Sequence, residues 1–498
     1  MKPLKVLLVA SEAAPFAKVG GLGDVVGSLP KFLLQEGVDA RVIIPLYRSV
    51  KLVEVLPEVT PPFVVPAKHH WEEAVLFAAK IPETEVVCYF IDNAKYFHRD
   101  VIYGSPDDEE RFVFFSRAVL ELLKRIDWQP DLFHLNDWQT ALIPSWLNTI
   151  YKKEKISRIA TLLTIHNLAY QGRTSRYILQ FANLDNFERV VPEITQDLRD
   201  QFFDIMWEGI SFADSLSTVS KTYAQEILTP EYGEGLEGLL QRRRARLFGI
   251  INGLDYDLWD PAKDKAIKFN YNKESLENKI KNKLVLQEEL GLKQSAELPL
   301  IGIVSRLTSQ KGFDLLIQAL VELERASCQI VLLGTGEKNY QELFLGLAKK
   351  YPERFSVNLK FDDQLARRIY AGSDIFLMPS RFEPCGLGQL IAMRYGSIPI
   401  VRKTGGLADT VTNFDPSLGI GTGFVFGNYE WQELCQTIYK AIEVYKNPEV
   451  WRKIIKNAMS CDFSWSRSAK EYLRLYRETI AFKMKSGKGE RKDGKRIS

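Results

Sequence analysis

Two similar glycine loops lie near opposite ends of this chain. The first reads Lys18-Val-Gly-Gly-Leu-Gly-Asp-Val-Val26 and the second reads Lys403-Thr-Gly-Gly-Leu-Ala-Asp-Thr-Val411. Each follows an apolar strand-like run and begins a helix-like segment, so its backbone N–H groups and the helix dipole suit an anion. One such loop alone is explained equally well as a simple turn. The pair indicates two α/β halves around a phosphate-bearing substrate.

A pair of cations ends a strand-like run in the second half of the chain. Arg306 and Lys311 stand five positions apart in Val304-Ser-Arg-Leu-Thr-Ser-Gln-Lys-Gly312, just before a helix-like segment. Arginine offers a planar fork for phosphate oxygens and lysine a mobile point charge, which together suit a diphosphate. Cations at a helix start oppose the helix dipole unless an anion compensates. Anion binding is therefore the favoured interpretation.

Polar residues close two strand-like runs in the first half. His134-Leu-Asn-Asp137 ends one run and Thr164-Ile-His166-Asn167 ends the next. A single histidine near a sheet is more often a structural group. Because open α/β sheets bind ligands at the carboxyl ends of their strands, polar residues at two neighbouring ends favour a functional site.

A tight turn carries a carboxylate in Pro379-Ser-Arg-Phe-Glu383-Pro384-Cys385-Gly386-Leu387-Gly388. Pro384 and Gly386 are expected to aim Glu383 at a ligand and to present the amides of Gly386 to Gly388. No base lies near Cys385 in the sequence, so we interpret it as a small wall residue. Asp255 and Asp257 imitate a metal-binding pair, but their Gly- and Trp-rich surroundings indicate a turn, and we expect no metal site.

Length and composition indicate an ordinary globular protein of two domains. The 498 residues are 46% hydrophobic and 26% charged, with a formal net charge of +3. The last sixteen residues hold seven Lys or Arg against two acids, so the body is near neutral and carries no nucleic-acid or membrane signature. We expect residues 485–498 to be a disordered basic tail, with a basic partner-binding arm as the alternative.

The cysteines and the N-terminus indicate a cytoplasmic location. The five cysteines are scattered and lack C-x-x-C spacing, which disfavours a disulfide framework and a zinc site. Met1-Lys-Pro leads directly into an apolar strand, so we expect no leader peptide, and no apolar run approaches the length of a membrane helix.

Apolar strand-like runs alternate with helical patterns along both halves, which predicts an α/β fold with two doubly wound parallel sheets. In the first half we expect strands at 5–10, 40–45, 85–91, 131–135 and 159–165, with helices at 23–35, 108–126, 138–150 and 199–212. In the second half we expect strands at 300–304, 329–333, 355–359, 375–378 and 398–401, with helices at 431–445, 448–459 and 466–484. The predicted domains are 1–251 (N-terminal) and 252–464 (C-terminal), followed by a helix at 465–484 and the tail at 485–498.

In combination and order, these motifs resemble the bacterial glycogen synthase and plant starch synthase family. The resemblance runs from Lys18-Val-Gly-Gly-Leu22 through His166-Asn-Leu-Ala-Tyr-Gln-Gly172, Ser305-Arg-Leu-Thr-Ser-Gln-Lys-Gly312 and Ser380-Arg-Phe-Glu-Pro-Cys-Gly-Leu387 to Arg402-Lys-Thr-Gly-Gly-Leu-Ala-Asp409. It implies the GT-B architecture of two Rossmann-like domains facing a deep cleft, with a C-terminal helix that crosses back to the first domain. It also implies that a cofactor- and metal-independent enzyme transfers glucose from ADP-glucose to the non-reducing end of an α-1,4-glucan with retention.

The same resemblance implies roles for individual residues. Arg306 and Lys311 would stabilise the departing diphosphate, with Lys18 assisting from the other domain, and His166, Asp137 and Glu383 would hold the donor glucose. The other substrate-binding residues that the resemblance implies are Gly20, Gly21, Asp24, Tyr103, Asn167, Asn252, Phe361, Cys385, Gly386, Leu387 and Gly388. No close acid and nucleophile pair is matched by the motifs, so we expect same-face attack with the departing phosphate as base.

The chain departs from the family pattern at three positions. Gly388 stands where many relatives have Thr, Phe361 where they have Tyr, and Gln139 where a His is common. Phe361 keeps the face expected to stack on adenine, whereas Gly388 lacks a hydroxyl for phosphate.

Other functions remain open at this stage. One alternative is a retaining enzyme of the same architecture that uses UDP-glucose or another acceptor, such as a sugar phosphate. Another is an inactive glucan- or nucleotide-binding homologue, which the intact Lys18, His166, Arg306, Lys311 and Glu383 disfavour. A glucan phosphorylase would need a pyridoxal phosphate lysine and a longer chain. Oligomeric state, regulation, priming and glucan length preference are not indicated by the sequence.

Overall fold

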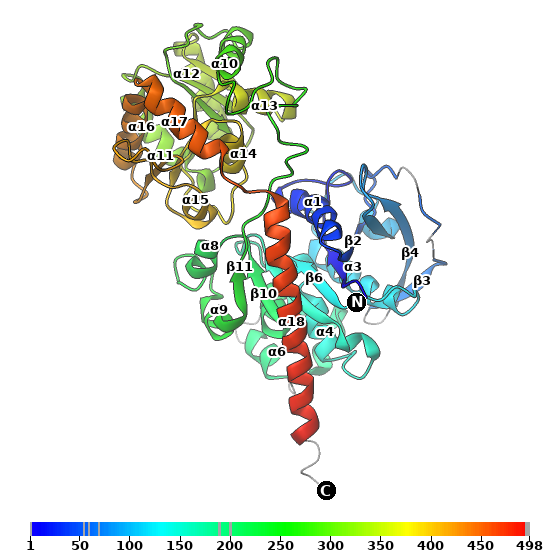
Figure 1. Ribbon diagram of the computed structural model, residues 1–498. Helices are drawn as coiled ribbons and strands as arrows, with labels where there is room; N and C mark the ends of the chain where they lie inside the picture. Colours follow the sequence, from blue (N-terminus) through cyan, green and yellow to red (C-terminus); the bar gives the residue numbers. More distant parts are fainter. Residues whose placement is uncertain are drawn as a thin grey trace. The chain divides into compact units, whose positions relative to one another are not determined.

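The computed structural model describes residues 2–52, 55–57, 60–67, 70–187, 191–198 and 202–493. The chain forms two compact units, coloured blue to green with a red helix and green to orange in Figure 1. Unit 1 comprises Met1–Val219, Ala224–Gly253 and Trp465–Ser498, and unit 2 comprises Ser220–Tyr223 and Leu254–Ser464. Apart from the short segment Ser220–Tyr223, the chain leaves unit 1 after Gly253 and returns to it after Ser464.

Unit 1 is built on one nine-stranded sheet in the order β11-β10-β7-β6-β1-β2-β5-β4-β3. Its strands are β1 (Lys5–Val9), β2 (Asp39–Pro45), β3 (Phe63–Ala67), β4 (His70–Lys80), β5 (Val87–Asp92), β6 (Leu132–Asn136), β7 (Ala160–Ile165), β10 (Ser215–Thr218) and β11 (Leu247–Gly249). The central strands β6 and β7 are buried along their whole length, as their continuous apolar sequences predict.

The expectation of an all-parallel first sheet is wrong at one edge. β4 runs antiparallel to both β3 and β5, while the other strands pair in parallel. β3 and β4 are joined by a short connection, and an antiparallel hairpin needs no crossover helix. The alternating small and apolar residues of β4 had given no strand prediction.

Helices cover both faces of this sheet and connect its strands. They are α1 (Gly21–Gln35), α2 (Ala94–Phe97), α3 (Asp108–Leu123), α4 (Leu142–Asn148), α5 (Arg176–Phe181), α6 (Pro192–Asp197), α7 (Ile205–Phe212), α8 (Lys221–Glu226) and α9 (Glu237–Arg243). The helix expected at 138–150 is a short 3-10 turn followed by α4, which contains Pro144. The helix expected at 199–212 begins only at Ile205, because Asp204 caps it by accepting the Trp207 N–H at 3.0 Å; residues 199–201 lie outside the described residues.

The long C-terminal helix α18 (Trp465–Asp493) belongs to unit 1, where it packs against α1 and β7. Figure 1 shows it in red beside the sheet of this unit. Its Tyr472 and Tyr476 are fully buried. The helix continues past residue 484, where the sequence predicts the start of a disordered tail, since no proline interrupts residues 485–493; residues 494–498 lie outside the described residues.

Unit 2 contains an all-parallel six-stranded sheet in the order β14-β13-β12-β15-β16-β17. Its strands are β12 (Leu300–Val304), β13 (Gln329–Leu333), β14 (Phe355–Asn358), β15 (Ile375–Met378), β16 (Ile398–Arg402) and β17 (Phe424–Phe426), of which only β17 is absent from the sequence prediction. Its helices are α10 (Glu277–Glu289), α11 (Phe313–Leu323), α12 (Lys338–Lys350), α13 (Asp363–Gly372), α14 (Gly388–Arg394), α15 (Gly405–Thr410), α16 (Trp431–Tyr445) and α17 (Pro448–Met459). None of the described helices, in either unit, is both long and apolar enough to cross a membrane.

Candidate active site

In unit 1 the sequence-predicted site residues gather at the carboxyl ends of three adjacent strands. The glycine loop with Lys18 follows β1, Asp137 follows β6, and His166 and Asn167 follow β7. The sheet order places β7, β6 and β1 side by side. Because parallel strands end at the same edge, residues far apart in the sequence reach one place.

Asp137 has the most unusual environment in this group. Its backbone has φ = +56°, a conformation that costs a non-glycine residue roughly 1–3 kcal/mol. Its carboxylate accepts the backbone N–H of His166 at 2.7 Å. Burial, with a smaller contribution from the nearby Glu12 charge, raises the pKa of Asp137 to about 7. Such strain and such a pKa are typical of functional sites rather than of structural aspartates.

The two histidines of the motifs have different roles. His134 is buried, and its ring nitrogens lie 2.8 Å from the Tyr476 hydroxyl and 2.7 Å from the Thr164 hydroxyl, so it ties α18 to the sheet. The half-buried His166 donates from Nε2 to the Asn136 amide oxygen at 3.0 Å, which leaves Nδ1 as an acceptor. Burial lowers the pKa of His166 to about 3, so the ring is neutral at pH 7.

The first glycine loop contains a residue that the sequence analysis missed. The buried Glu12 carboxylate accepts the backbone N–H groups of Val19 and Gly20. The sequence analysis expected the Gly20 N–H to be open to an anionic ligand, but Glu12 already accepts it. Burial raises the pKa of Glu12 in spite of these hydrogen bonds. Glu12 lies three residues beyond β1 and belongs to no recognisable motif, so only its place next to a strand end could have signalled it.

The remaining residues of this loop pair with each other. The Lys18 ammonium lies 2.7 Å from the Asp24 carboxylate, and both side chains are partly exposed. A Cβ at Gly23 would lie 3.2 Å from the Lys18 side chain and 3.3 Å from Glu12. A larger residue would thus press on both groups, and the glycine keeps Lys18 close to α1.

Tyr103, Asn167 and Asn252 occupy three different environments. The Tyr103 hydroxyl lies 2.7 Å from the Ser11 hydroxyl and also bonds to Glu12. Asn167 accepts the Ala169 N–H at 3.1 Å and so shapes the turn after β7. Asn252 is buried, and its amide oxygen has no hydrogen-bond partner among the described residues; the same holds for Gln139. Unsatisfied buried amides are rare in stable cores and are consistent with a ligand-facing position.

In unit 2 a buried ion pair joins the ends of the adjacent strands β12 and β15. Lys311 Nζ lies 2.6 Å from Glu383 Oε2, with side-chain exposures of 18% and 8%. The Ser380 hydroxyl donates to the same carboxylate oxygen at 3.0 Å. Arg306, which also follows β12, is exposed and forms no ion pair with any described residue. The arrangement sets an unneutralised guanidinium at the same sheet edge as a fixed Lys–Glu pair.

The second glycine loop has a structural explanation. Gly405 has φ = +43°, and a Cβ there would overlap the Glu383 carbonyl oxygen, while one at Gly406 would overlap that of Cys385. The Gly406 N–H donates to the Glu383 and Pro384 carbonyls, each at 3.1 Å. The amide is therefore used within the fold. The second glycine loop therefore holds the Glu383 turn in place. The sequence had instead suggested that it binds an anion.

In the turn after Glu383, Pro384 and Cys385 are buried, whereas Gly386, Leu387 and Gly388 are half-buried. Gly386 has φ = +73° and packs on Gln389, Leu387 occupies the N-cap position of α14, and Gly388 is its first residue. A Cβ at Gly388 would lie 3.1 Å from the Phe376 ring and 3.2 Å from the Met378 sulfur. Phe376 and Met378 thus fill the space that a threonine would need.

Phe361 follows β14 and is 91% exposed. A phenylalanine ring this exposed makes little contact with the rest of the fold, so its face is open to a ligand. Asp255 and Asp257 form a turn in which the Asp257 N–H donates to Asp255 at 2.8 Å, and Asp257 also pairs with Lys263 at 3.3 Å. Within the described residues no three His, Cys, Asp or Glu side chains cluster as metal ligands would.

Comparison with known proteins decides the family. A model for the starch synthase catalytic domain matches residues 5–242, and one for group 1 glycosyl transferases matches residues 288–459. The glycogen synthase of Clostridium perfringens is 48% identical over 482 residues, which cover 96% of this chain and 99% of that protein. This chain belongs to the glycogen and starch synthase family. The glycogen synthase of Thermotoga petrophila is 46% identical over 488 residues, which cover 96% of this chain and 99% of that protein.

Solved structures give the same family and fold. The catalytic domain of starch synthase IV from Arabidopsis thaliana, bound to ADP and acarbose, has a TM-score of 0.89 and 36% identity, covering 96% of this chain and 100% of that one. Sucrose-phosphate synthase from Thermosynechococcus elongatus, at 19% identity and a TM-score of 0.59, shares the fold. This family member is thus a glucosyltransferase of GT-B architecture, as the resemblance implied.

Proposed function

We propose that this glycogen synthase family member transfers glucose from ADP-glucose to the non-reducing end of an α-1,4-glucan, with retention at the anomeric carbon. The main support for this proposal is the charged cluster of Arg306, Lys311 and Glu383 at one edge of the unit 2 sheet. There the unneutralised Arg306 follows the same strand as Lys311, whose ammonium is fixed by Glu383 at 2.6 Å. Two cations on one strand end suit the two phosphates of a nucleotide diphosphate.

The cations act on the leaving group in this proposal. As the bond between the anomeric carbon and the distal phosphate breaks, negative charge grows on the diphosphate. Arg306 and Lys311 stabilise that charge without reorganising, since Lys311 is already held by Glu383. Lys18, whose ammonium lies 2.7 Å from the Asp24 carboxylate, is assigned to the diphosphate by the family resemblance alone.

Donor identity is the second part of the proposal. The exposed ring of Phe361 is available to stack on a nucleobase. The 36% identical starch synthase IV domain is bound to ADP, which supports adenine over uracil. Its acarbose likewise supports a glucan-like acceptor for this chain. Asp137, His166, Asn167, Asn252 and Tyr103 are assigned to the sugars.

The neutral His166 and the Asp137 carboxyl, whose pKa is raised to about 7, are assigned to hydrogen bonds with the sugar hydroxyls. We assign same-face attack by the acceptor hydroxyl, with the departing phosphate as base, and no covalent glucosyl-enzyme intermediate. The reaction in this proposal needs neither a metal nor another cofactor. The cysteine spacing supports the cytoplasm as its location.

One experiment tests these assignments together. Nucleotide diphosphate release is measured from ADP-glucose and, in parallel, from UDP-glucose, with and without glycogen and with a metal chelator present. Glycogen-dependent ADP release that survives the chelator is expected. Turnover with UDP-glucose alone would overturn the donor assignment, and loss of turnover in the chelator would overturn metal independence. Glycogen binding without any turnover would identify an inactive homologue.

A further inference from the structure

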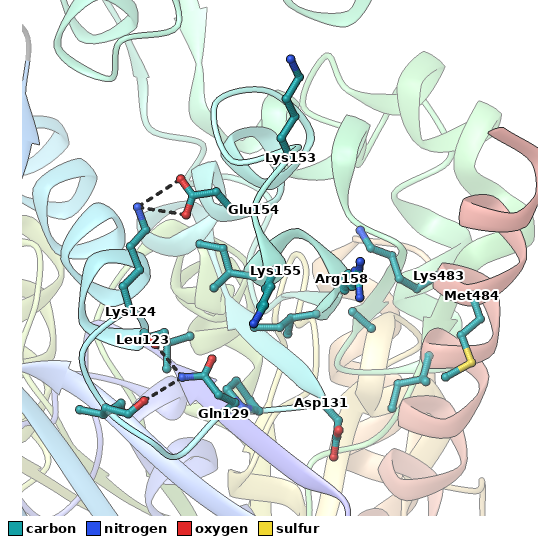
Figure 2. Close-up of a pocket in the computed structure, with 16 residues that line it drawn as sticks. Leu123, Lys124, Gln129, Asp131, Lys153, Glu154, Lys155, Arg158, Lys483 and Met484 are labelled. Atoms are coloured by element: carbon teal, nitrogen blue, oxygen red, sulfur yellow. Dashed lines mark hydrogen bonds and ion pairs between the residues drawn. The ribbon is translucent and has the colours of Figure 1, made fainter. Parts of the chain in front are cut away.

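A pocket of about 800 Å³ opens in unit 1 where β6 and β7 begin (Figure 2). Its walls come from the end of α3, the residues just before β6, the turn at 153–160 before β7, and α18. Asp137 and His166 follow the opposite ends of the same two strands. A five-residue strand spans about 17 Å, so this pocket is separate from the candidate active site.

The floor of the pocket is apolar. Leu123, Ile156, Ile159 and Ala160 line it with buried side chains. Met484 of α18 extends this surface and is 64% exposed. An exposed methionine beside buried aliphatic residues leaves apolar surface that a ligand can cover.

The rim of the pocket carries more cations than acids. Lys155 and Arg158 form no ion pair with any described residue. Lys483 of α18 also lines the pocket, and its ammonium is paired with Asp214 at 3.5 Å. Like charges without a counter-charge, such as Lys155 and Arg158, repel one another, and an anion relieves that repulsion.

The two acids of the lining are already engaged. Lys124 pairs with Glu154 at 3.2 Å, and Asp131 accepts the Lys5 N–H at 2.9 Å. Figure 2 shows Arg158 and Lys483 directed toward the space between the turn and α18, whereas Lys153 points away from it. The lining holds five Lys or Arg side chains against these two acids, so its net charge is positive.

We propose that this pocket binds an organic phosphate, a small molecule that joins an apolar body to a phosphate group. The Arg158 guanidinium takes two phosphate oxygens as a fork, and Lys155 and Lys483 add point charges. The apolar floor covers the body of the molecule. Neither inorganic phosphate nor an uncharged apolar compound matches both surfaces.

Phenyl phosphate is the probe, titrated calorimetrically into the full-length protein. Saturable binding is expected that is tighter than that of phenol, which lacks the charge, and of inorganic phosphate, which lacks the ring. Benzoate shares the ring but has a smaller anionic head, and weaker binding is expected. Absence of saturable phenyl phosphate binding would overturn the proposal, and equal binding of benzoate would overturn its assignment to phosphate.

Matched charge reversals locate the site. Lys155→Glu and Arg158→Glu, both at exposed positions, are each expected to weaken phenyl phosphate binding by roughly tenfold or more, the loss of a charge-assisted hydrogen bond. Lys152→Glu makes the same charge change at a neighbouring exposed lysine that does not line the pocket, and is expected to stay within about twofold of the unmodified protein. An equal loss of phenyl phosphate affinity in all three variants would indicate a diffuse effect of surface charge and would overturn the assignment of binding to this pocket.

A last variant separates this site from the proposed donor site. Arg306→Ala removes a cation of unit 2 and is expected to leave phenyl phosphate binding unchanged. If Arg306→Ala abolishes binding while Arg158→Glu does not, the probe occupies the donor site and the inference fails. The proposed transferase function is unaffected by either result.

Discussion

Lys311 and Glu383 form a 2.6 Å ion pair although 72 positions separate them in the sequence. The sequence analysis assigned one to phosphate and the other to glucose. Their contact makes them a single unit in which each fixes the other, with Ser380 as a third member. A substrate that reaches both groups therefore meets a preorganised pair of opposite charges.

The pair predicts non-additive mutational effects. Lys311→Met and Glu383→Gln are each expected to lower kcat by about 10²–10³-fold, since each removes a charge aimed at the transition state. The double variant is expected to lose little more than the worse single variant, because either change already breaks the unit. Steady-state kinetics of the three variants test this, with thermal unfolding as the control for folding. Multiplicative losses would show that the two residues act separately.

Phe361 predicts a change in donor affinity alone. Because its ring is 91% exposed, Phe361→Ala costs the fold little, yet it removes a stacking surface worth roughly 1–3 kcal/mol. The KM for ADP-glucose is expected to rise about 5- to 150-fold with kcat nearly unchanged. Phe361→Tyr keeps the aromatic face and serves as the matched control. An unchanged KM in Phe361→Ala would remove this residue from the donor site.

Ionisation of Asp137 is expected to produce a limb in the pH profile of kcat/KM. Its pKa is raised to about 7 by burial, so the carboxylate ionises between about pH 6 and 8. The ionised form accepts hydrogen bonds from sugar hydroxyls more strongly, and kcat/KM is expected to rise with pH through 7. In Asp137→Asn this limb should disappear together with much of the activity. A limb that persists in the variant would belong to another group.

Glu208 predicts a pH dependence of stability. This buried carboxyl receives a 2.8 Å hydrogen bond from Ser145, and its other oxygen has no partner among the described residues. Burial raises the pKa of Glu208 to about 8 from an ordinary 4.5. Between these values the folded state holds a proton that the unfolded state has lost, so stability falls as pH rises, by up to about 1.4 kcal/mol per pH unit.

Glu208→Gln tests that slope because it keeps the Ser145 hydrogen bond and cannot ionise. Urea unfolding at several pH values between 5 and 8 is expected to show a flatter dependence in the variant than in the unmodified protein. Parallel curves for the two proteins would assign the slope to other groups.

Most parallel strands and their carboxyl-end residues were accessible to sequence reasoning, whereas the short parallel strands β10, β11 and β17 were missed. Leu300–Val304, Gln329–Leu333 and Ile375–Met378 have the predicted bounds, because buried parallel strands are short continuous apolar runs. The hairpin β3–β4 was not predicted, because antiparallel edge strands lack the continuous apolar run of a buried parallel strand. The family and its glucosyltransferase activity, implied by the motifs, are confirmed by the relatives.

Two features of the candidate site could be recognised only from the folded structure. The Gly405-Gly406 pair copies the first glycine loop in sequence, but its glycines are required by the carbonyls of Glu383 and Cys385, which only the folded chain brings there. Glu12 binds the Val19 and Gly20 amides across a turn that no motif marks. Similar residue patterns can thus bind a side-chain carboxylate in one place and backbone carbonyls in another.

The most direct test of the account follows the transferred sugar itself. ADP-glucose labelled with ¹³C in the glucose is incubated with maltoheptaose, and the new linkage is read by NMR while ADP is quantified. The account predicts one labelled glucose in α-1,4 linkage at the non-reducing end for each ADP released. A β-linkage, or ADP release with free labelled glucose in place of a longer glucan, would contradict it.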